Sequence, residues 1–385
     1  MKIIKDVIYK YIRINENEQK LIDSPELQRL RRIRQLPFSY LVYPGANHTR
    51  FEHSLGVMHV AGKIAEKLNL DVQKFRIAGL LHDIGHGPFS HLSEMFLSSI
   101  GEEGKHEKIV WKVLKGELGK ILNSIGYSKK EIYNLIIGKG KFSEIISGGI
   151  DADRIDYLQR DAYYTGSASG RINAEYIINL MEKFRGKIVI PEKGLLTAEE
   201  ILLARYMMRN NVYLHHTTLI TSSMLLHSLY KEYENGNLKI DEFVRMDDYS
   251  AFNFLRNNEI FKRIIERRLF KRAFLVRYDE INKSKIKELY NYKKLREVEK
   301  EIAEKANVNK EEIIIDIRQL PEKSKINVLV KWRGKVRNIE EISKFMKVLN
   351  EAEKDRWYLG IYTPKEKVKM VSKVAKKILG RWCSW

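Results

Sequence analysis

The sequence predicts a mainly α-helical protein, in which a helical bundle is followed by a small C-terminal α/β module. Apolar residues recur at helical spacing in several stretches before residue 230, and the character changes after about residue 280, where β-rich runs appear. The chain has 385 residues, of which 44% are hydrophobic, so it can bury one large core and a smaller second one. We therefore expect a bundle with a helical extension over residues 1–280 and the α/β module over residues 281–385.

The first helices of the bundle carry clear signals. Ser24 can cap a helix, and Pro25 suits its first position. Residues 51–68 show helical periodicity, and one stripe of this helix consists of Val57, Val60, Ile64 and Leu68. His53 lies one helical turn before this stripe and is expected to point inward with it.

A second apolar helix is predicted over residues 75–83. The glycine-rich stretch that starts at Gly85 ends it. His82 and Asp83 are therefore expected in its last turn, beside a loop. Two further helices are predicted downstream, over residues 152–162 and, as one long helix, over residues 197–230.

The α/β module is predicted from a mixed pattern near the C-terminus. The strands show β-branched runs, and the final helix is basic. The order resembles a ferredoxin-like arrangement. In sequence it comprises a helix-like stretch at 284–306, strands at 311–318 and 326–332, a helix at 339–353, a strand at 357–363 and the basic helix.

The composition bears on compartment and partners. Cys383 is the single cysteine, so no intrachain disulfide can form and a cysteine-based zinc site is excluded. The first residues show no secretion signal, and no run of 18 apolar residues occurs. We expect a protein of the reducing cytoplasm with no membrane partner.

The formal net charge is +20. Such a charge concentrates polyanions, including nucleotides and nucleic acids, around a protein. Charged residues also make up 31% of the chain, a level typical of heat-adapted surfaces with ion-pair networks. Both explanations stay open here. If nucleic acid is bound, the arginine-rich helix at Arg29–Arg34 is the expected surface.

Histidines and carboxylates gather in a way that favours chemistry over packing. His53, His82, Asp83 and Asp153 offer two imidazoles and two carboxylates, a donor set that suits a divalent metal. A single such histidine is more often a core residue. However, three histidines crowd the ten residues that begin at His82, and buried imidazoles rarely gather without a function because each ring needs its own partners.

Three long motifs resemble the HD-domain deoxynucleotide triphosphohydrolases. They are HTRFEHSLGV at His48–Val57, AGLLHDIGHGPFSH at Ala78–His91 and GIDADRIDYLQRD at Gly149–Asp161. The similarity covers roughly residues 20–230. It implies a helical HD domain with a metal at its centre, and an enzyme that releases a nucleoside and triphosphate from a dNTP.

The resemblance also implies roles for single residues. His53, His82, Asp83 and Asp153 would bind the metal, which could be Zn, Mn, Fe, Ni or Mg. A catalytic set would comprise His86, His91, Glu94 and His106, with His106 as general acid. The family usually has Asp where Glu94 stands. The alternative for His106 is a surface histidine, since its neighbours are charged.

The substrate residues follow from the same resemblance. Tyr157 would pack against the deoxyribose and Asp161 would bind its 3′-hydroxyl, since both share a helix face with Asp153. Alternatively, Tyr157 is a core aromatic and Asp161 pairs with Arg160. The triphosphate would meet Arg50, Arg154 and Arg205, and the base would meet Gln35 and Leu36.

A second departure from the family and two rival functions remain. The family's Asp-Pro-Ile-His-Gly motif of the nucleotide-activator site is Asp6-Val7-Ile8-Tyr9-Lys10 here, which argues against nucleotide activation. A nucleic-acid-binding protein or nuclease would use the positive charge. A cyclic-nucleotide phosphodiesterase fits Tyr157 and Asp161 less well. We also expect a homo-oligomer, as the resemblance implies.

Overall fold

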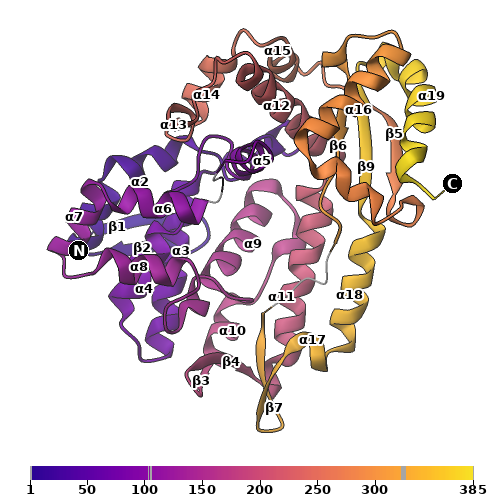
Figure 1. Cartoon of the computed structure of the whole chain (residues 1–385). Coiled ribbons are helices and arrows are strands. Elements are labelled where there is room, and N and C mark those ends of the chain that lie inside the picture. The colour runs from indigo at the N-terminus through magenta and orange to yellow at the C-terminus, as the bar shows by residue number, and fades with distance from the viewer. Residues whose placement is uncertain (1, 103, 105, 322–326, 385) are drawn as a thin grey trace.

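A computed structural model describes residues 2–102, 104, 106–321 and 327–384. The chain is mainly α-helical, as the sequence predicts (Figure 1). Among the described residues, no helix is both long and apolar enough to cross a bilayer.

The HD part is built on three helices. Helix α3 (Arg50–Lys67) packs along α4 (Val72–Leu81) and against α9 (Ala152–Thr165). All three were predicted, and α4 ends slightly earlier than expected, so that His82 caps it. Around them lie α1 (Glu16–Ile22), α2 (Pro25–Arg29), α6 (His106–Leu114), α7 (Glu117–Ser124), α8 (Lys129–Ile136) and α10 (Ala174–Leu180).

Local signals explain where these helices begin. Ser24 accepts a hydrogen bond from Leu27 N–H, and Pro25 is the first residue of α2, as predicted. Asp151 caps α9 by accepting from Arg154 N–H. The inner faces form one large core, in which Val57, Ile64 and Leu80 are fully buried. Burial of this apolar surface is the main stabilising contribution.

The long helix expected over residues 197–230 is interrupted. Helix α11 (Leu195–Met208) passes into a π-helical turn at Arg209–Tyr213, and α12 (His216–Glu234) follows. The extended backbone of His215 separates the two, and its Nδ1 accepts the Thr217 N–H. A side-chain cap at this position starts a new helix, and the polar run Arg209–Asn211 lies at the interruption.

A second core lies where α12 meets the helices that follow it. It unites Met224 and Leu229 with Phe96 of α5 (His91–Ser99). The helices that complete it are α13 (Ile240–Phe243), α14 (Asp248–Leu255) and α15 (Glu259–Ile265).

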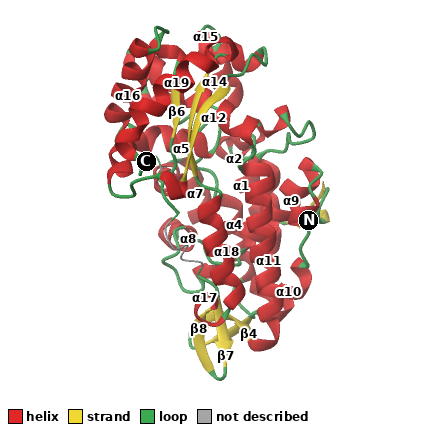
Figure 2. Cartoon of the chain, turned by 90° about the vertical axis from the view of Figure 1, so that its right-hand side faces the viewer, coloured by secondary structure: helices red, strands yellow, loops and turns green. Residues whose placement is uncertain are grey.

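Two larger sheets lie at opposite ends of the molecule (Figure 2). The antiparallel sheet of the C-terminal module has the order β5-β9-β6, from Lys271–Arg277, Tyr358–Thr363 and Ile314–Asp316. It has three strands in the described residues, fewer than a ferredoxin-like βαββαβ fold has. Helices α16 (Tyr292–Lys305) and α19 (Val368–Leu379) flank it.

The other sheet brings the C-terminal region back to the HD part. Strand β7 (Leu329–Trp332) pairs in parallel with β4 (Lys187–Pro191), and β3 (Glu182–Phe184) and β8 (Lys335–Asn338) lie at the edges. Helix α18 (Lys344–Asp355), after the short α17 (Ile339–Ile342), packs on α11. The division at residue 280 stays a prediction. Each of the two larger sheets contains strands from before and from after residue 280.

An N-terminal hairpin of β1 (Lys2–Asp6) and β2 (Lys10–Ile14) completes the fold. Asp6 stands at its turn and accepts the Ile8 and Tyr9 N–H groups. Its second carboxylate oxygen lies 2.9 Å from Nη1 of Arg160 in α9. The hairpin therefore buttresses the helix that carries Asp153.

Candidate active site

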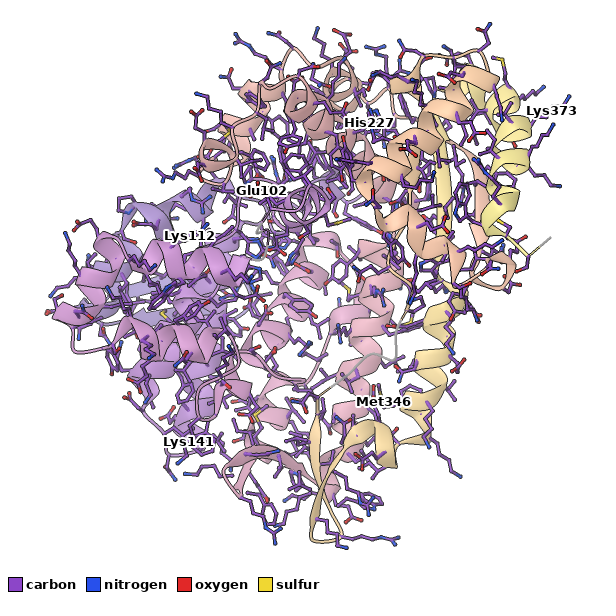
Figure 3. The ribbon with its side chains drawn as sticks, viewed as in Figure 1. Glu102, Lys112, Lys141, His227, Met346 and Lys373 are labelled. Atoms are coloured by element: carbon purple, nitrogen blue, oxygen red, sulfur yellow. The ribbon has the colours of Figure 1, made fainter. Side chains whose placement is uncertain are left out.

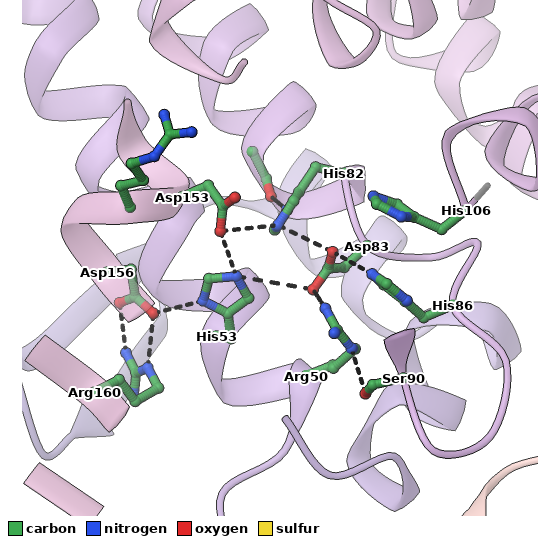
Figure 4. Close-up of polar contacts among 12 residues, drawn as sticks. Arg50, His53, His82, Asp83, His86, Ser90, His106, Asp153, Asp156 and Arg160 are labelled. Atoms are coloured by element: carbon green, nitrogen blue, oxygen red, sulfur yellow. Dashed lines mark hydrogen bonds and ion pairs between the residues drawn. The ribbon is translucent and has the colours of Figure 1, made fainter. Parts of the chain in front are cut away.

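Three helix segments bring metal-type ligand atoms together. Nε2 of His53, from α3, lies 3.0 Å from Oδ1 of Asp153 at the start of α9 (Figure 4). Nε2 of His82, just after α4, lies 3.9 Å from the same oxygen. Ligand atoms of the three residues lie within 4.8 Å of one another. Asp83 adjoins the group, with Oδ1 3.2 Å from His82 Nε2.

The two histidines are oriented by their other nitrogens. Nδ1 of His53 is 2.8 Å from Oδ2 of Asp156, and Nδ1 of His82 is 2.7 Å from the Gly79 carbonyl oxygen. A proton on each Nδ1 leaves the Nε2 lone pair facing Asp153. Such outer contacts fix the tautomer of metal-binding histidines. The arrangement is ready to accept a cation.

The chemistry of this donor set fits a divalent ion. Nε2 of His82 is buried and has no hydrogen-bond partner among the described residues. Burial lowers the pKa of His82 and so keeps its ring neutral, as a metal ligand must be. Burial also disfavours a charged His53, yet its hydrogen bonds to Asp153 and Asp156 raise its pKa to about 10. The field at this point therefore stabilises positive charge.

Asp83 is held between the group and a buried arginine. Its Oδ2 lies 2.5 Å from Nη1 of Arg50, whose Nε donates to Ser90. Burial alone would raise the pKa of Asp83. The charge of Arg50 outweighs this effect and holds the pKa well below its usual range. Asp83 is thus ionised and placed beside the metal-type group.

The expected catalytic set forms a second cluster next to the first. His86, His91 and His106 each place Nδ1 near the Glu94 carboxylate, at 3.0, 3.2 and 2.7 Å. The His86 and His106 rings stack with centroids 4.0 Å apart. Nε2 of His86 lies 3.2 Å from Asp83 Oδ1, so Asp83 adjoins both clusters. Glu94, although longer than the family's Asp, reaches all three rings.

The two stacked imidazoles of this cluster, His86 and His106, have pKa values shifted in opposite directions. Burial, Arg50 and His106 lower the pKa of His86 to about 3, so His86 is neutral. For His106, hydrogen bonding and charge from Glu94 outweigh burial and raise the pKa. The raised pKa favours a proton on His106 over His86, and the His106 side chain is 17% exposed.

Asp161 lies at the far end of the α9 face. Its Oδ1 is 2.7 Å from His48 Nε2, and its Oδ2 accepts the Tyr213 hydroxyl at 2.7 Å. Arg160 instead pairs with Asp156, so the surface pair considered above does not form. Tyr157 lies edge-on to Tyr213, with ring centroids 6.5 Å apart.

The three arginines expected to contact the triphosphate lie in two different environments. Arg154 and Arg205 lie close enough to Tyr157 to oppose the rise in its pKa, which burial brings to about 12. Arg154 also binds the Gly148 carbonyl and Asp151. Arg50, by contrast, is 2% exposed and is engaged with Asp83.

The expected base-lining residues, Gln35 and Leu36, contact His48 and the large core. The Gln35 N–H donates to the His48 carbonyl, and its side-chain oxygen is buried without a described partner. Leu36 packs against the large core. Gln35 is therefore connected to Asp161 through His48.

Three supporting residues were given no role from the sequence: His48, Asp156 and Tyr213. One signal was present, because Asp156 and Arg160 are four apart on a helix and carry opposite charges. The others act through contacts between distant segments, which local spacing does not reveal.

The matches to known families decide the identity. Residues 50–161 match the HD domain, and residues 172–381 match the HD associated region. The chain belongs to the HD-domain family. It is an HD-domain phosphohydrolase, a hydrolytic enzyme, and the HD domain is a divalent-metal-binding domain.

Several relatives are similar over much of the chain. An uncharacterised protein of Methanocaldococcus jannaschii is 40% identical over 96% of this chain and 80% of its own length. The deoxynucleoside triphosphate triphosphohydrolase SAMHD1 homolog of Dictyostelium discoideum is 33% identical over 56% of this chain. The chain spans 46% of that relative and 34% of chicken SAMHD1, to which it is 34% identical.

Solved structures share the fold along the whole chain. A hypothetical protein of Aquifex aeolicus matches with a TM-score of 0.76 and 30% identity, covering 97% of this chain and 99% of its own. A phosphohydrolase of Bacteroides thetaiotaomicron, at 24% identity, shares the fold with a TM-score of 0.74, covering 95% and 100%.

Proposed function

We propose that this HD-domain phosphohydrolase hydrolyses deoxynucleoside triphosphates to a nucleoside and triphosphate. The observation that carries the proposal is the position of Asp83, which adjoins both the metal-type group and the Glu94–His106 cluster. A metal at one cluster and a protonated imidazole at the other suit attack on a phosphorus and departure of an alkoxide. Relatives named deoxynucleoside triphosphate triphosphohydrolases support the substrate class.

The metal would be held by His53, His82, Asp83 and Asp153. When bound, it lowers the pKa of a coordinated water and polarises a phosphoryl oxygen. Asp156 and the Gly79 carbonyl keep both imidazoles in the ligating tautomer. Arg50 keeps Asp83 ionised and in place.

His106 would supply the proton for the leaving group. Its Nδ1 faces Glu94, so its Nε2 can present a proton to the 5′ oxygen. Water oxygen bonds to the α-phosphorus, the bond from phosphorus to the 5′ oxygen breaks, and that oxygen takes the His106 proton. Triphosphate retains the water oxygen, and the water's proton leaves to solvent. Glu94 stabilises the imidazolium before transfer.

The remaining residues would position the substrate. Arg154 and Arg205 offer planar, fixed cations to the triphosphate. Tyr157 would fill the space of a ribose 2′-hydroxyl, and Asp161, oriented by His48 and Tyr213, would accept the 3′-hydroxyl. Gln35 and Leu36 would lie nearer the base. Homo-oligomer formation and a cytoplasmic location remain part of this proposal.

The test is a panel of dNTPs and NTPs with Mn²⁺, Mg²⁺, Zn²⁺, Fe²⁺ and Ni²⁺, with products separated by anion-exchange chromatography. We expect triphosphate and nucleoside in equal amounts from dNTPs. Release of pyrophosphate or of single phosphates would overturn the reaction type. Equal turnover of both sugars would leave only the broader HD-domain phosphohydrolase.

A further inference from the structure

The arginine-rich segment near the N-terminus is not a free basic surface. Arg29 donates to the carbonyl oxygens of Ile84, His86 and Met246, and Arg32 is bound to Asp247. The other two cover rings: the guanidinium of Arg31 lies 3.6 Å from the Phe51 centroid, and that of Arg34 lies 4.8 Å from the Tyr40 centroid. Arg29, Arg32 and the two ring contacts join this segment to other parts of the fold, so much of its charge is engaged within the protein.

Many exposed lysines of this chain have a carboxylate partner on the same helix. In α16, Lys294 lies 3.1 Å from Glu297, and Lys305 lies 2.7 Å from Glu301. The same spacing gives Lys262–Glu259 in α15 and Lys354–Glu351 in α18. Such pairs account for part of the high content of charged residues. In each pair the lysine charge is balanced by a carboxylate on the same helix, so the pair adds no net positive charge to the surface.

Helix α19 departs from this pattern. Its sequence, VKMVSKVAKKIL, contains no acidic residue. Residues 365–381 hold seven Lys or Arg and one Glu, a net +6 of the chain's +20. Four lysines of α19 are exposed and have no ion pair in the described residues: Lys369, Lys373, Lys376 and Lys377. We name these four the lysine ridge, and Figure 3 shows Lys373 pointing away from the module.

The ridge is held in place by the opposite face of the helix. Val371, Ala375, Ile378 and Leu379 are at most 3% exposed and pack into the core of the module. Lys369, Lys373 and Lys377 follow each other at four-residue intervals, so they line one side of the helix over about 12 Å. The same length of duplex carries about seven phosphates, at one per ~1.7 Å of axis.

We propose that the lysine ridge of α19 binds the sugar–phosphate backbone of double-stranded nucleic acid. Lysine is a compact point charge that suits phosphate oxygens, and α19 carries no Arg, Asn or Gln for paired contacts to base edges, so we expect the binding to be independent of sequence. This surface is separate from the active site, and the inference does not rest on the proposed hydrolysis.

Two other anionic partners fit the ridge less well. Single strands are bound on exposed aromatic rings, but the nearby Trp382 is 3% exposed and serves the module core. A membrane-surface helix inserts an apolar face, and that face of α19 is already buried. Among the described large apolar residues of α19, Met370 is exposed, at 47%. One such residue is too little for an apolar face that inserts into a membrane.

The test compares two triple variants of the full chain. One carries Lys369→Gln, Lys373→Gln and Lys377→Gln. The control carries Lys130→Gln, Lys139→Gln and Lys141→Gln, exposed lysines of the HD part, and so has the same net charge. Figure 3 places Lys141 on the opposite side of the molecule from Lys373. Binding to two unrelated DNA duplexes of about 30 base pairs is followed by fluorescence anisotropy over a range of salt concentrations.

We expect the wild type to bind both duplexes equally. The ridge variant should lose at least ~10-fold in affinity at about 100 mM salt, and the slope of log K against log salt should fall by about 2–3. The control should lose less than ~2-fold. An unchanged thermal melt in the ridge variant, with unchanged phosphohydrolase activity, excludes misfolding.

Four outcomes would overturn the proposal. They are no duplex binding by the wild type at low salt, equal losses in both variants, tighter binding to a single strand of the same length, and binding to vesicles of anionic phospholipid in place of DNA. The third would indicate a stacking surface elsewhere, and the fourth a membrane contact.

Discussion

Gly56 lies so close to Asp156 that a Cβ atom at this glycine would stand 1.8 Å from the carboxylate atom Oδ1. Helix α3 thus approaches α9 at the one point where Asp156 reaches across to His53. A side chain here would move the carboxylate that orients a metal-type ligand.

Gly56→Ala should therefore weaken both the fold and the metal site. Helix propensity alone would favour alanine by about 1 kcal/mol, but the overlap with Asp156 and Arg160 is far larger. Thermal unfolding and elemental analysis check this. A higher melting temperature with full metal content would contradict it.

Asp156→Asn should lower metal affinity by about 10–100-fold, since the amide holds the His53 tautomer less firmly. Metal titration followed by calorimetry measures this. Asp247→Asn is the matched control, because Asp247 caps α14 and pairs with Arg32 at a distance from His53. An equal loss in both variants would remove the orienting role.

His82→Ala and Asp83→Ala should both abolish bound metal and hydrolysis, yet differ in stability. Loss of Asp83 leaves the buried Arg50 charge unpaired, which costs about 3–5 kcal/mol, whereas His82 leaves no such charge. Denaturant unfolding of the metal-free variants separates the two. Full metal occupancy in either variant would refute the ligand assignment.

His106→Ala should reduce kcat by about a hundred-fold with metal content unchanged, as expected for a lost general acid. The acid must be protonated, so wild-type activity should fall as pH rises through the raised pKa of His106. Glu94→Gln removes the group that raises this pKa. As the pH is raised, the activity of this variant should therefore begin to fall at a lower pH than that of the wild type. A pH profile of kcat decides between this role and a structural one, which would leave the profile unmoved.

Tyr157→Ala should narrow the preference for dNTP over NTP, which we expect to be roughly a hundred-fold in the wild type. Kinetics with dGTP and GTP measure it. Tyr213→Phe keeps the ring but removes the hydroxyl that contacts Asp161, so it should raise KM for dGTP with less effect on the sugar ratio. If Tyr157→Ala leaves the ratio intact, Tyr157 is a core aromatic.

The parts of the molecule that sequence reasoning predicted are those determined by local spacing. Helix α3 with His53 follows from the periodicity of residues 51–68, and helix α9 with Asp153 was predicted over residues 152–162. Arg160 was considered as a partner for Asp161, but neighbours on a helix point about 100° apart, so Arg160 pairs with Asp156 one turn away.

Contacts between distant segments could not be predicted in this way. Asp161 is bound by His48 and Tyr213, which lie 113 and 52 positions away. Tyr213 is brought there by the π-helical turn, whose polar first residues, Arg209–Asn211, do not by themselves indicate a π-helix. Similarly, the strand near residue 330 has β-forming residues but nothing that names its partner in the HD part.

That parallel pairing has a consequence for how the protein is made. Ile190 of β4 pairs with Val330 of β7, 140 positions later in the chain. On the ribosome, β4 emerges long before β7 exists, and helices α11 to α16 with strands β5 and β6 are synthesised in between. The HD part therefore completes its sheet only after β7 and β8 have been synthesised. Until then the nascent chain exposes an open β edge, which favours pairing with the wrong strand.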